Sequence, residues 1–216
     1  MELKDHARKT GVPLVPPPSQ NNHNNNNQPP LPLPSSIQSF LDRFYMSRIG
    51  IRMLIGQHVA LNKSASTRSN QDPDYVGIIC TKTSLRKVTM EAIDNARFIC
   101  QDYYGLWGGP EVKLMGTDDV EFMYVPSHLH HMLFELLKNS LRAVVERFGI
   151  DNEEWPEIRV VVAAGKEDIT IKVSDEGGGI PRSGMPLVWT YMYTTAEKPL
   201  LEEGFNKNDF RAPMAG

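Results

Sequence analysis

The chain has 216 residues, enough for one domain of ordinary size or for a small domain with a partner domain. Its formal charge is −3, and without a basic block it lacks the usual signature of nucleic-acid binding. No apolar run in the sequence is long enough to cross a bilayer. Cys80 and Cys100 are its two cysteines, and their spacing argues against both a zinc site and a disulfide framework.

Residues 1–35 are predicted to form a disordered segment or linker. Residues 13–34 hold eight of the sixteen prolines and an asparagine-rich run at 21–27. A segment of this composition buries too little apolar surface to offset the entropy lost on ordering. The first eleven residues mix acidic and basic side chains without an apolar stretch, so we expect neither a secretory signal nor a mitochondrial presequence there.

The next part of the chain has the spacing of helices with one strand between them. Apolar residues at helical spacing predict an amphipathic helix over Ser36–Leu61, and such a helix needs a partner surface to be stable. A polar loop is predicted over residues 62–74, followed by a short buried strand at 76–80. Ser84 is predicted to cap a second helix, whose inner face carries Leu85, Val88, Ala92, Ala96 and Ile99.

The second half of the chain alternates between helix and strand. Residues 105–110 predict a turn, and a weak strand at 112–115 precedes a long helix that includes residues 130–144. Two strands are predicted at 157–164 and 168–174 with a short turn between them, which indicates a β-hairpin, and the second strand alternates in polarity. Beyond Pro181 the sequence predicts loop structure.

Five polar side chains share a narrow arc, about 100° wide, on the helix HHMLFELLKNSLRAV. They are His131, Glu135, Lys138, Asn139 and Arg142. The opposite side is predicted to hold Leu129, Leu133, Leu136, Leu137, Leu141, Ala143 and Val144. One interpretation is a partly buried surface helix with a Glu135–Lys138 ion pair. The other is a stripe that lines a cleft, where cations meet a polyphosphate, the amide oxygen meets a hard metal ion and the carboxylate accepts a proton.

A second feature favours the cleft. The strand at 168–174 runs directly into Asp175, which continues the inward-facing alternation, and then into Gly177, Gly178 and Gly179. Glycines let backbone approach a flat ligand closely. A DxGxG sequence alone is also common in tight turns, but its place some thirty residues after a Glu-x-x-Lys-Asn-x-x-Arg helix is more specific.

This pairing resembles the N-box and first glycine box of the GHKL ATP-binding superfamily. Over a longer span the chain is similar to the mitochondrial pyruvate dehydrogenase kinases, a resemblance carried by residues 39–58, 124–149, 169–184 and 190–199. The related branched-chain 2-oxoacid dehydrogenase kinases share the two boxes, and the order from His131 to Glu135 favours the pyruvate enzyme. The resemblance implies an α+β fold, a Bergerat-type ATP-binding α/β sandwich. It would be incomplete at its C-terminus and preceded by a remnant of a helical-bundle domain.

The resemblance also implies roles for the residues of the two boxes. Glu135 would be the general base that takes a proton from a substrate serine, and His131 would tune it, unless His131 is only a satisfied, partly buried histidine. Asn139 would ligate Mg²⁺, and Lys138 and Arg142 would lie beside the phosphates of ATP or steady Glu135.

At the other end of the nucleotide, Asp175 would accept a hydrogen bond from the adenine amino group, while Gly177 and Gly179 make room for the base. Thr194 and Thr195 match a nucleotide-contacting pair, and Gly216 would be the first glycine of a lid over the phosphates. We therefore expect residues 36–74 to be a helical remnant and residues 75–216 a kinase domain that stops at this lid, so that the chain by itself is an inactive or incomplete form.

The function implied by the resemblance is a protein serine kinase of the mitochondrial matrix. It would use ATP and Mg²⁺ to inactivate the pyruvate dehydrogenase complex by phosphorylating its decarboxylase α subunit. It would dock on the lipoyl domains of the acetyltransferase core and form a homodimer, with no nucleic acid and no membrane span involved. The alternatives are a GHKL ATPase in which Glu135 activates water, and a non-catalytic module. A histidine kinase is disfavoured because His58 lacks the acidic neighbour of a phosphoacceptor.

Overall fold

A computed structural model describes residues 33–66, 72–116, 120–152, 154–191 and 193. Within these ranges the predicted α+β class is confirmed, and no helix is long and apolar enough to cross a membrane. The elements in chain order are α2 (Ser35–Ser66), β1 (Tyr75–Val76), β2 (Ile79–Ser84), α3 (Leu85–Tyr104), β3 (Val112–Gly116), β4 (Glu121–Tyr124), α4 (Pro126–Phe148), β5 (Ile158–Ala164), β6 (Ile169–Ser174) and the 3-10 helix η1 (Met185–Leu187).

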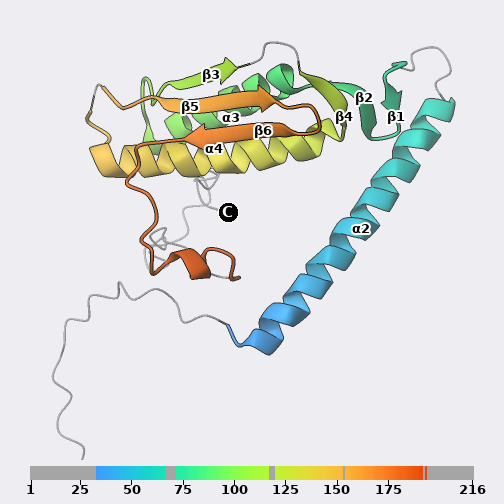
Figure 1. Ribbon diagram of the computed structural model, residues 1–216, viewed down its shortest axis with the longest axis horizontal. Coiled ribbons are helices and arrows are strands. Elements are labelled where there is room, and N and C mark those ends of the chain that lie inside the picture. The colour runs from blue at the N-terminus through green and yellow to red at the C-terminus, as the bar shows by residue number, and fades with distance from the viewer. Residues whose placement is uncertain (1–32, 67–71, 117–119, 153, 192, 194–216) are drawn as a thin grey trace, which may run out of the picture.

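The main body has two layers, a sheet of order β3-β5-β6 and the helices α3 and α4 that cover one face of it (Figure 1). Strand β3 pairs in parallel with β5, and β5 pairs antiparallel with β6 from Arg159↔Ser174 to Ala164↔Ile169. The predicted β-hairpin is therefore confirmed. Its antiparallel register brings the end of β6 beside the start of β5, and it is this end that continues into Asp175.

The hydrophobic core lies between this sheet and the two helices. Central strand β5 alternates as an inward-facing strand should, with Ile158 and Val160 fully buried. On α3, Ala92 and Ala96 are fully buried, and these small side chains let α4 pack closely against α3. Leu85, Val88, Leu133, Leu137, Leu141 and Val144 complete the centre of the core. The core face of α4 therefore has a fixed orientation, and its polar face is left for other contacts.

The start of α3 follows its sequence signals. The Ser84 side chain accepts a hydrogen bond of 3.3 Å from the backbone N–H of Lys87, as predicted for an N-cap. At the other end, Gly105 adopts a left-handed φ of 66° and closes the helix with its N–H on the carbonyl of Gln101. The predicted second helix and the turn after it are both confirmed.

Cys100, on the core face of α3, gives a prediction about alkaline stability. Burial raises the pKa of its thiol from 9.0 to about 11. Because the unfolded thiol ionises first, the stabilisation is complete below pH 9, and it is lost as the pH rises to about 11. We expect the wild-type chain to lose about 2 kcal/mol more unfolding free energy than Cys100→Ala between pH 8.5 and 11, measured by urea denaturation under reducing conditions. Identical pH dependence of the two proteins would contradict this prediction.

Between residues 62 and 124 the sequence analysis needs correction at three points. The segment 76–80 is not one strand, because Gly77 turns the chain with a φ of 66° and separates β1 from β2. The predicted loop at 62–74 is shorter, since α2 continues to Ser66. Strand β4 was not predicted; it pairs with β2, and the second sheet has the order β1-β2-β4. A four-residue strand and a two-residue strand carry too little alternation to be recognised from sequence.

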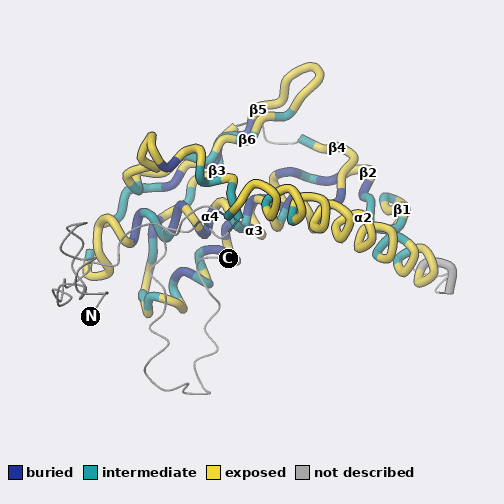
Figure 2. Tube along the Cα trace, turned by 90° about the horizontal axis from the view of Figure 1, so that it is seen from below, coloured by how far each residue is buried: buried dark blue, intermediate teal, exposed yellow. Residues whose placement is uncertain are grey.

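Helix α2 is longer than predicted and stands away from the two-layer body (Figure 1). Its apolar side chains are exposed along most of its length, as the yellow tube of Figure 2 shows, and Phe40 and Leu54 are 58% and 74% exposed. The described residues therefore do not supply the partner surface that the amphipathic pattern requires.

Contacts near the two ends of α2 connect it to the rest of the chain. Toward its C-terminus, the Gln57 side chain donates to the carbonyl of Val76 and accepts from the N–H of Ile78, at 3.1 and 2.9 Å. Toward its N-terminus, the Tyr191 hydroxyl donates to Asp42 at 2.9 Å, and the ring of Tyr191 stacks on that of Tyr45. These contacts connect α2 to the rest of the described chain near both of its ends, while most of its apolar side chains stay exposed.

Candidate functional site

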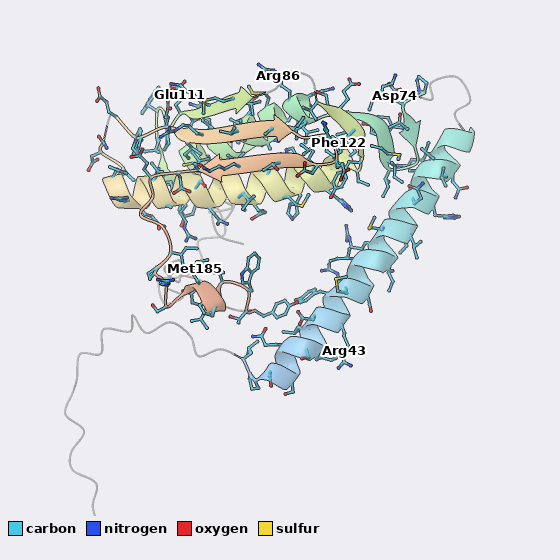
Figure 3. The ribbon with its side chains drawn as sticks, viewed as in Figure 1. Arg43, Asp74, Arg86, Glu111, Phe122 and Met185 are labelled. Carbon is cyan, nitrogen blue, oxygen red and sulfur yellow. The ribbon has the colours of Figure 1, made fainter. Side chains whose placement is uncertain are left out.

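A groove of about 1010 Å³ lies between α4 and the chain that follows β6. One wall is the exposed side of α4, and the other is built from Val173 at the end of β6, the Asp175–Pro181 region, Val188 and Tyr193. Figure 3 shows side chains of α4 extending toward the segment that carries the labelled Met185. The site is therefore formed by two stretches that are about forty residues apart in the sequence.

The groove-lining part of α4 overlaps the predicted polar stripe but is not identical with it. Relative to His131 at 0°, the lining residues of α4 span about 20° to 180° around the helix. Glu135, Asn139 and Arg142 fall within this arc and line the groove, as predicted for the cleft interpretation. His131 and Lys138, at about 0° and −20°, lie just outside the groove lining.

Two apolar residues of α4 were assigned to the wrong side. Leu136 is 52% exposed and lines the groove, and Ala143 lies beside the glycine turn instead of in the core. Both lie within the groove arc because α3 and the sheet cover only part of the apolar side of the helix. The wheel alone does not show how much of the apolar side is covered, so it does not separate Leu136 and Ala143 from the buried leucines.

Lys138 is buried and holds the carboxylate of Glu135. Its side chain is only 7% exposed, and its Nζ lies 3.0 Å from Oε1 of Glu135. The same ammonium lies over the ring of Phe134, 5.0 Å from its centroid. The predicted Glu135–Lys138 pair therefore exists, and Glu135 lines the groove at the same time. Lys138 therefore holds one oxygen of the Glu135 carboxylate from outside the groove.

Arg142 follows one turn after Lys138 and is also mostly covered. Its guanidinium Nε lies 3.4 Å from Oε1 of Glu146, in an i,i+4 pair on the groove side of α4. This part of the groove therefore carries a cation and a carboxylate side by side.

Asp175 is held in the groove by two hydrogen bonds. The hydroxyl of Ser140 donates to its Oδ2 at 2.8 Å, and the backbone N–H of Gly177 donates to its Oδ1 at 2.9 Å. Ser140 is a residue of α4 that sequence reasoning missed. It lies at about 180° on the wheel, far from the polar stripe, and the one available signal was its position next to Asn139.

The glycine turn after Asp175 packs directly on α4. A Cβ added at Gly177 would lie 2.9 Å from the backbone carbonyl carbon of Ala143, closer than real contacts allow. Gly178 and Gly179 have φ angles of 99° and 72°, which residues with a side chain rarely adopt. Arg147 of α4 donates from Nη1 to the carbonyl of Glu176 at 2.7 Å and so also holds the start of this turn. The turn is therefore fixed to the helix by backbone contact.

Gly177→Ala is expected to destabilise the chain by about 1–3 kcal/mol, because the new methyl group must displace either α4 or the turn. Thermal unfolding followed by circular dichroism measures the effect. Gly108→Ala is the matched control, since a Cβ at Gly108 meets nothing within 4 Å. The control should change stability by less than about 0.5 kcal/mol. Equal stability of the two variants would show that the turn does not lie against Ala143.

Three predicted site residues belong to the C-terminal segment that the structure does not describe. Thr194, Thr195 and Gly216 lie outside the described residues, so their predicted contacts stay predictions. Among the residues that are described, no group of three or more His, Cys, Asp or Glu side chains could hold a metal ion. An amide oxygen such as that of Asn139 lies outside that definition, and Asn139 is exposed in the groove.

Comparison with known proteins gives two family matches. A family described as mitochondrial branched-chain alpha-ketoacid dehydrogenase kinase matches residues 10–80, and one described as histidine kinase-, DNA gyrase B- and HSP90-like ATPase matches residues 124–206. The second match contains α4, the hairpin and the glycine turn, which together form the groove. The expected GHKL relationship of the fold is thereby confirmed.

Individual curated proteins are also similar to this chain over most of its length. A mitochondrial pyruvate dehydrogenase (acetyl-transferring) kinase of Schizosaccharomyces pombe is 52% identical over 184 residues, covering 84% of this chain and 42% of that protein. The Arabidopsis thaliana enzyme of the same name is 54% identical over 167 residues, covering 77% and 44% respectively.

The chain belongs to the pyruvate dehydrogenase kinase family. A third relative of the same name, from Drosophila melanogaster, is 45% identical over 195 residues, covering 86% of this chain and 44% of that protein. The chain thus spans less than half the length of these pyruvate dehydrogenase kinases. All three are named for pyruvate, so the branched-chain alternative is not favoured, and all three are named mitochondrial.

Proposed function

We propose that the groove binds ATP as the nucleotide site of a mitochondrial-matrix protein serine kinase that acts on the pyruvate dehydrogenase complex. The observation that carries the proposal is that Glu135, Asn139 and Asp175 line one groove, although they come from two separate motifs. Relatives that are 45–54% identical over 167–195 residues are named pyruvate dehydrogenase (acetyl-transferring) kinases, which supports this assignment. Residues 75–216 would supply the nucleotide-binding domain, and residues 36–74 part of a helical domain.

Asp175 is proposed to bind the adenine. An ionised carboxylate only accepts hydrogen bonds, so it pairs with the amino group of adenine and repels the carbonyl of guanine or hypoxanthine. Gly177 and Gly179 line the groove beside it: the missing side chain of Gly177 lets the turn pack against α4, and a Cβ at Gly179 would meet nothing within 4 Å. This end of the groove would therefore select the base.

Glu135 is proposed to accept the proton of the substrate serine. It is carried by a rigid helix and lines the groove, and Lys138 holds Oε1 from behind at 3.0 Å, which leaves Oε2 for the substrate hydroxyl. Of the two roles predicted for Lys138, this geometry favours steadying Glu135 over contact with phosphates. Arg142 lines the groove and is the cation proposed to face the phosphates, with Glu146 as its present partner. His131 would act on Glu135 from one turn away.

Asn139 fits a magnesium site of the kind that nucleotide enzymes use. Mg²⁺ keeps several waters and takes one or two protein oxygens together with oxygens of the substrate phosphates. The amide of Asn139 offers one such oxygen in the groove, close along the helix to Glu135. When bound, Mg²⁺ would neutralise charge on the phosphates, and the chain's own residues would position the nucleotide and remove the proton.

Three assays on the purified chain separate the hypotheses. Calorimetric titration with ADP tests the nucleotide site, and wild-type protein that fails to bind ADP would overturn the proposal. Radiolabelled transfer from ATP to the decarboxylase α subunit tests the kinase. Phosphate release without a protein acceptor would favour the ATPase alternative, and nucleotide binding without transfer or hydrolysis would favour a non-catalytic module.

Binding to isolated lipoyl domains and sedimentation of the chain test the proposed docking and dimerisation.

A further inference from the structure

The side chain of Ser140, on α4, donates a hydrogen bond to Asp175 at the base-binding end of the groove. We propose that Ser140 is a positioning residue that makes the site selective for 6-aminopurines by fixing the carboxylate of Asp175. The inference rests on the proposed nucleotide site and adds to it a residue that determines which base is bound. Ser140 would not itself touch the nucleotide.

The geometry gives Ser140 control over the carboxylate plane. The last torsion of an aspartate side chain is broad, so a carboxylate with one partner can rotate. Here the N–H of Gly177 holds Oδ1 at 2.9 Å and the hydroxyl of Ser140 holds Oδ2 at 2.8 Å. Two donors on different oxygens fix the plane, and Ser140 supplies the one that comes from the core side, where it is itself 7% exposed.

The same two contacts leave acceptor capacity facing the groove. A carboxylate has about four acceptor positions, and the two internal donors use about half of them. The remaining positions can accept the 6-amino group of adenine, whereas the 6-carbonyl of hypoxanthine would face an acceptor. Without the Ser140 hydroxyl the carboxylate can turn away, and the difference between an amino and a carbonyl group is reduced.

The test compares the binding of ADP and of inosine diphosphate, which carries a 6-carbonyl, to the full chain by calorimetric titration. Ser140→Ala removes the hydroxyl without adding volume. We expect it to weaken ADP binding about tenfold and to change inosine diphosphate binding less than about twofold, so that the preference for ADP shrinks about tenfold. Ser140→Cys keeps a side chain of similar size with a weak donor, and should show the same loss if the alanine variant does not fold.

Thr89→Val is the matched control. The Thr89 hydroxyl is also buried and donates at 2.7 Å, but to the carbonyl of Leu85 in α3, away from the groove. This variant loses a buried hydrogen bond and should keep the wild-type preference.

The outcomes separate this inference from the function on which it rests. A wild-type chain that binds neither nucleotide overturns the proposed function. A wild-type chain that binds both equally overturns selection by the Asp175 and Ser140 pair and leaves nucleotide binding standing. Unchanged preference in the Ser140 variants, or an equal loss for both nucleotides, overturns the positioning role and shows that the hydroxyl only stabilises the fold.

Discussion

Asp175→Ala is expected to weaken ADP binding to the chain by about ten- to a hundredfold, the largest effect of any single change on the base-binding end of the groove. Hydrogen bonds to a charged group contribute about 1.5–3 kcal/mol, and each 1.4 kcal/mol is a factor of ten in affinity. The alanine variant also releases its two internal donors, Ser140 and the N–H of Gly177, which hold the turn in place. Calorimetric titration of both proteins with ADP measures the loss.

Asp175→Asn separates the two parts of this effect. The asparagine keeps an oxygen for the N–H of Gly177 and can still pair with the Ser140 hydroxyl, so the turn should keep its shape. It places a donor where the carboxylate had an acceptor, and should therefore bind ADP less well and inosine diphosphate better. If both variants bound ADP with wild-type affinity, Asp175 would not contribute to nucleotide binding.

Glu135→Gln is expected to lower phosphoryl transfer by about a thousandfold in any form of the protein in which the wild-type sequence transfers phosphate. Glutamine has nearly the same shape but cannot accept the serine proton at neutral pH. Because the change lies away from the base-binding end, ADP affinity should stay within about threefold of wild type. Radiolabelled transfer to the decarboxylase α subunit and ADP titration measure the two quantities on the same samples.

The control for Glu135→Gln must account for Lys138. Neutralising Glu135 leaves the mostly buried ammonium of Lys138 without its carboxylate, so some loss of thermal stability is expected as well. Glu146→Gln makes the same substitution on the same helix, at a carboxylate that also lines the groove and pairs with a cation. Its transfer rate should change less than about fivefold. Transfer by Glu135→Gln above a tenth of the wild-type rate would exclude Glu135 as the base.

Local sequence signals predicted the elements that depend on local physics. The serine cap at Ser84 satisfies a free N–H within one turn, and the alternation in 169–174 specifies which face of that strand turns inward. Gly77 illustrates the opposite case. This single left-handed glycine turns the chain, so that β1 and β2 become separate, antiparallel strands of the same sheet. Nothing in the run VGIIC itself distinguishes that turn from a continuous strand.

Helix α2 shows another limit of sequence-based prediction. Its periodic apolar residues correctly indicate a helix, but periodicity only says that one side seeks a partner. In the described part of the chain Phe40, Phe44 and Leu54 stay exposed, and polar contacts of Gln57 and Tyr191 hold the helix instead. An amphipathic pattern therefore predicts a helix but does not identify the surface that covers its apolar side.

The sequence by itself determined that Glu135 and Asn139 share one side of a helix and that Asp175, shortly before three glycines, follows an alternating strand, because helix and strand periods are properties of the local backbone. Only the tertiary structure decided how far that side of the helix is open. Leu136 and Ala143 line the groove although they belong to the apolar side of the helix, the buried Ser140 reaches Asp175 there, and His131 and Lys138 fall outside the groove lining. The physical reason is that the groove depends on how α4 is rotated against the end of β6, and this rotation is set by core packing between residues far apart in the chain.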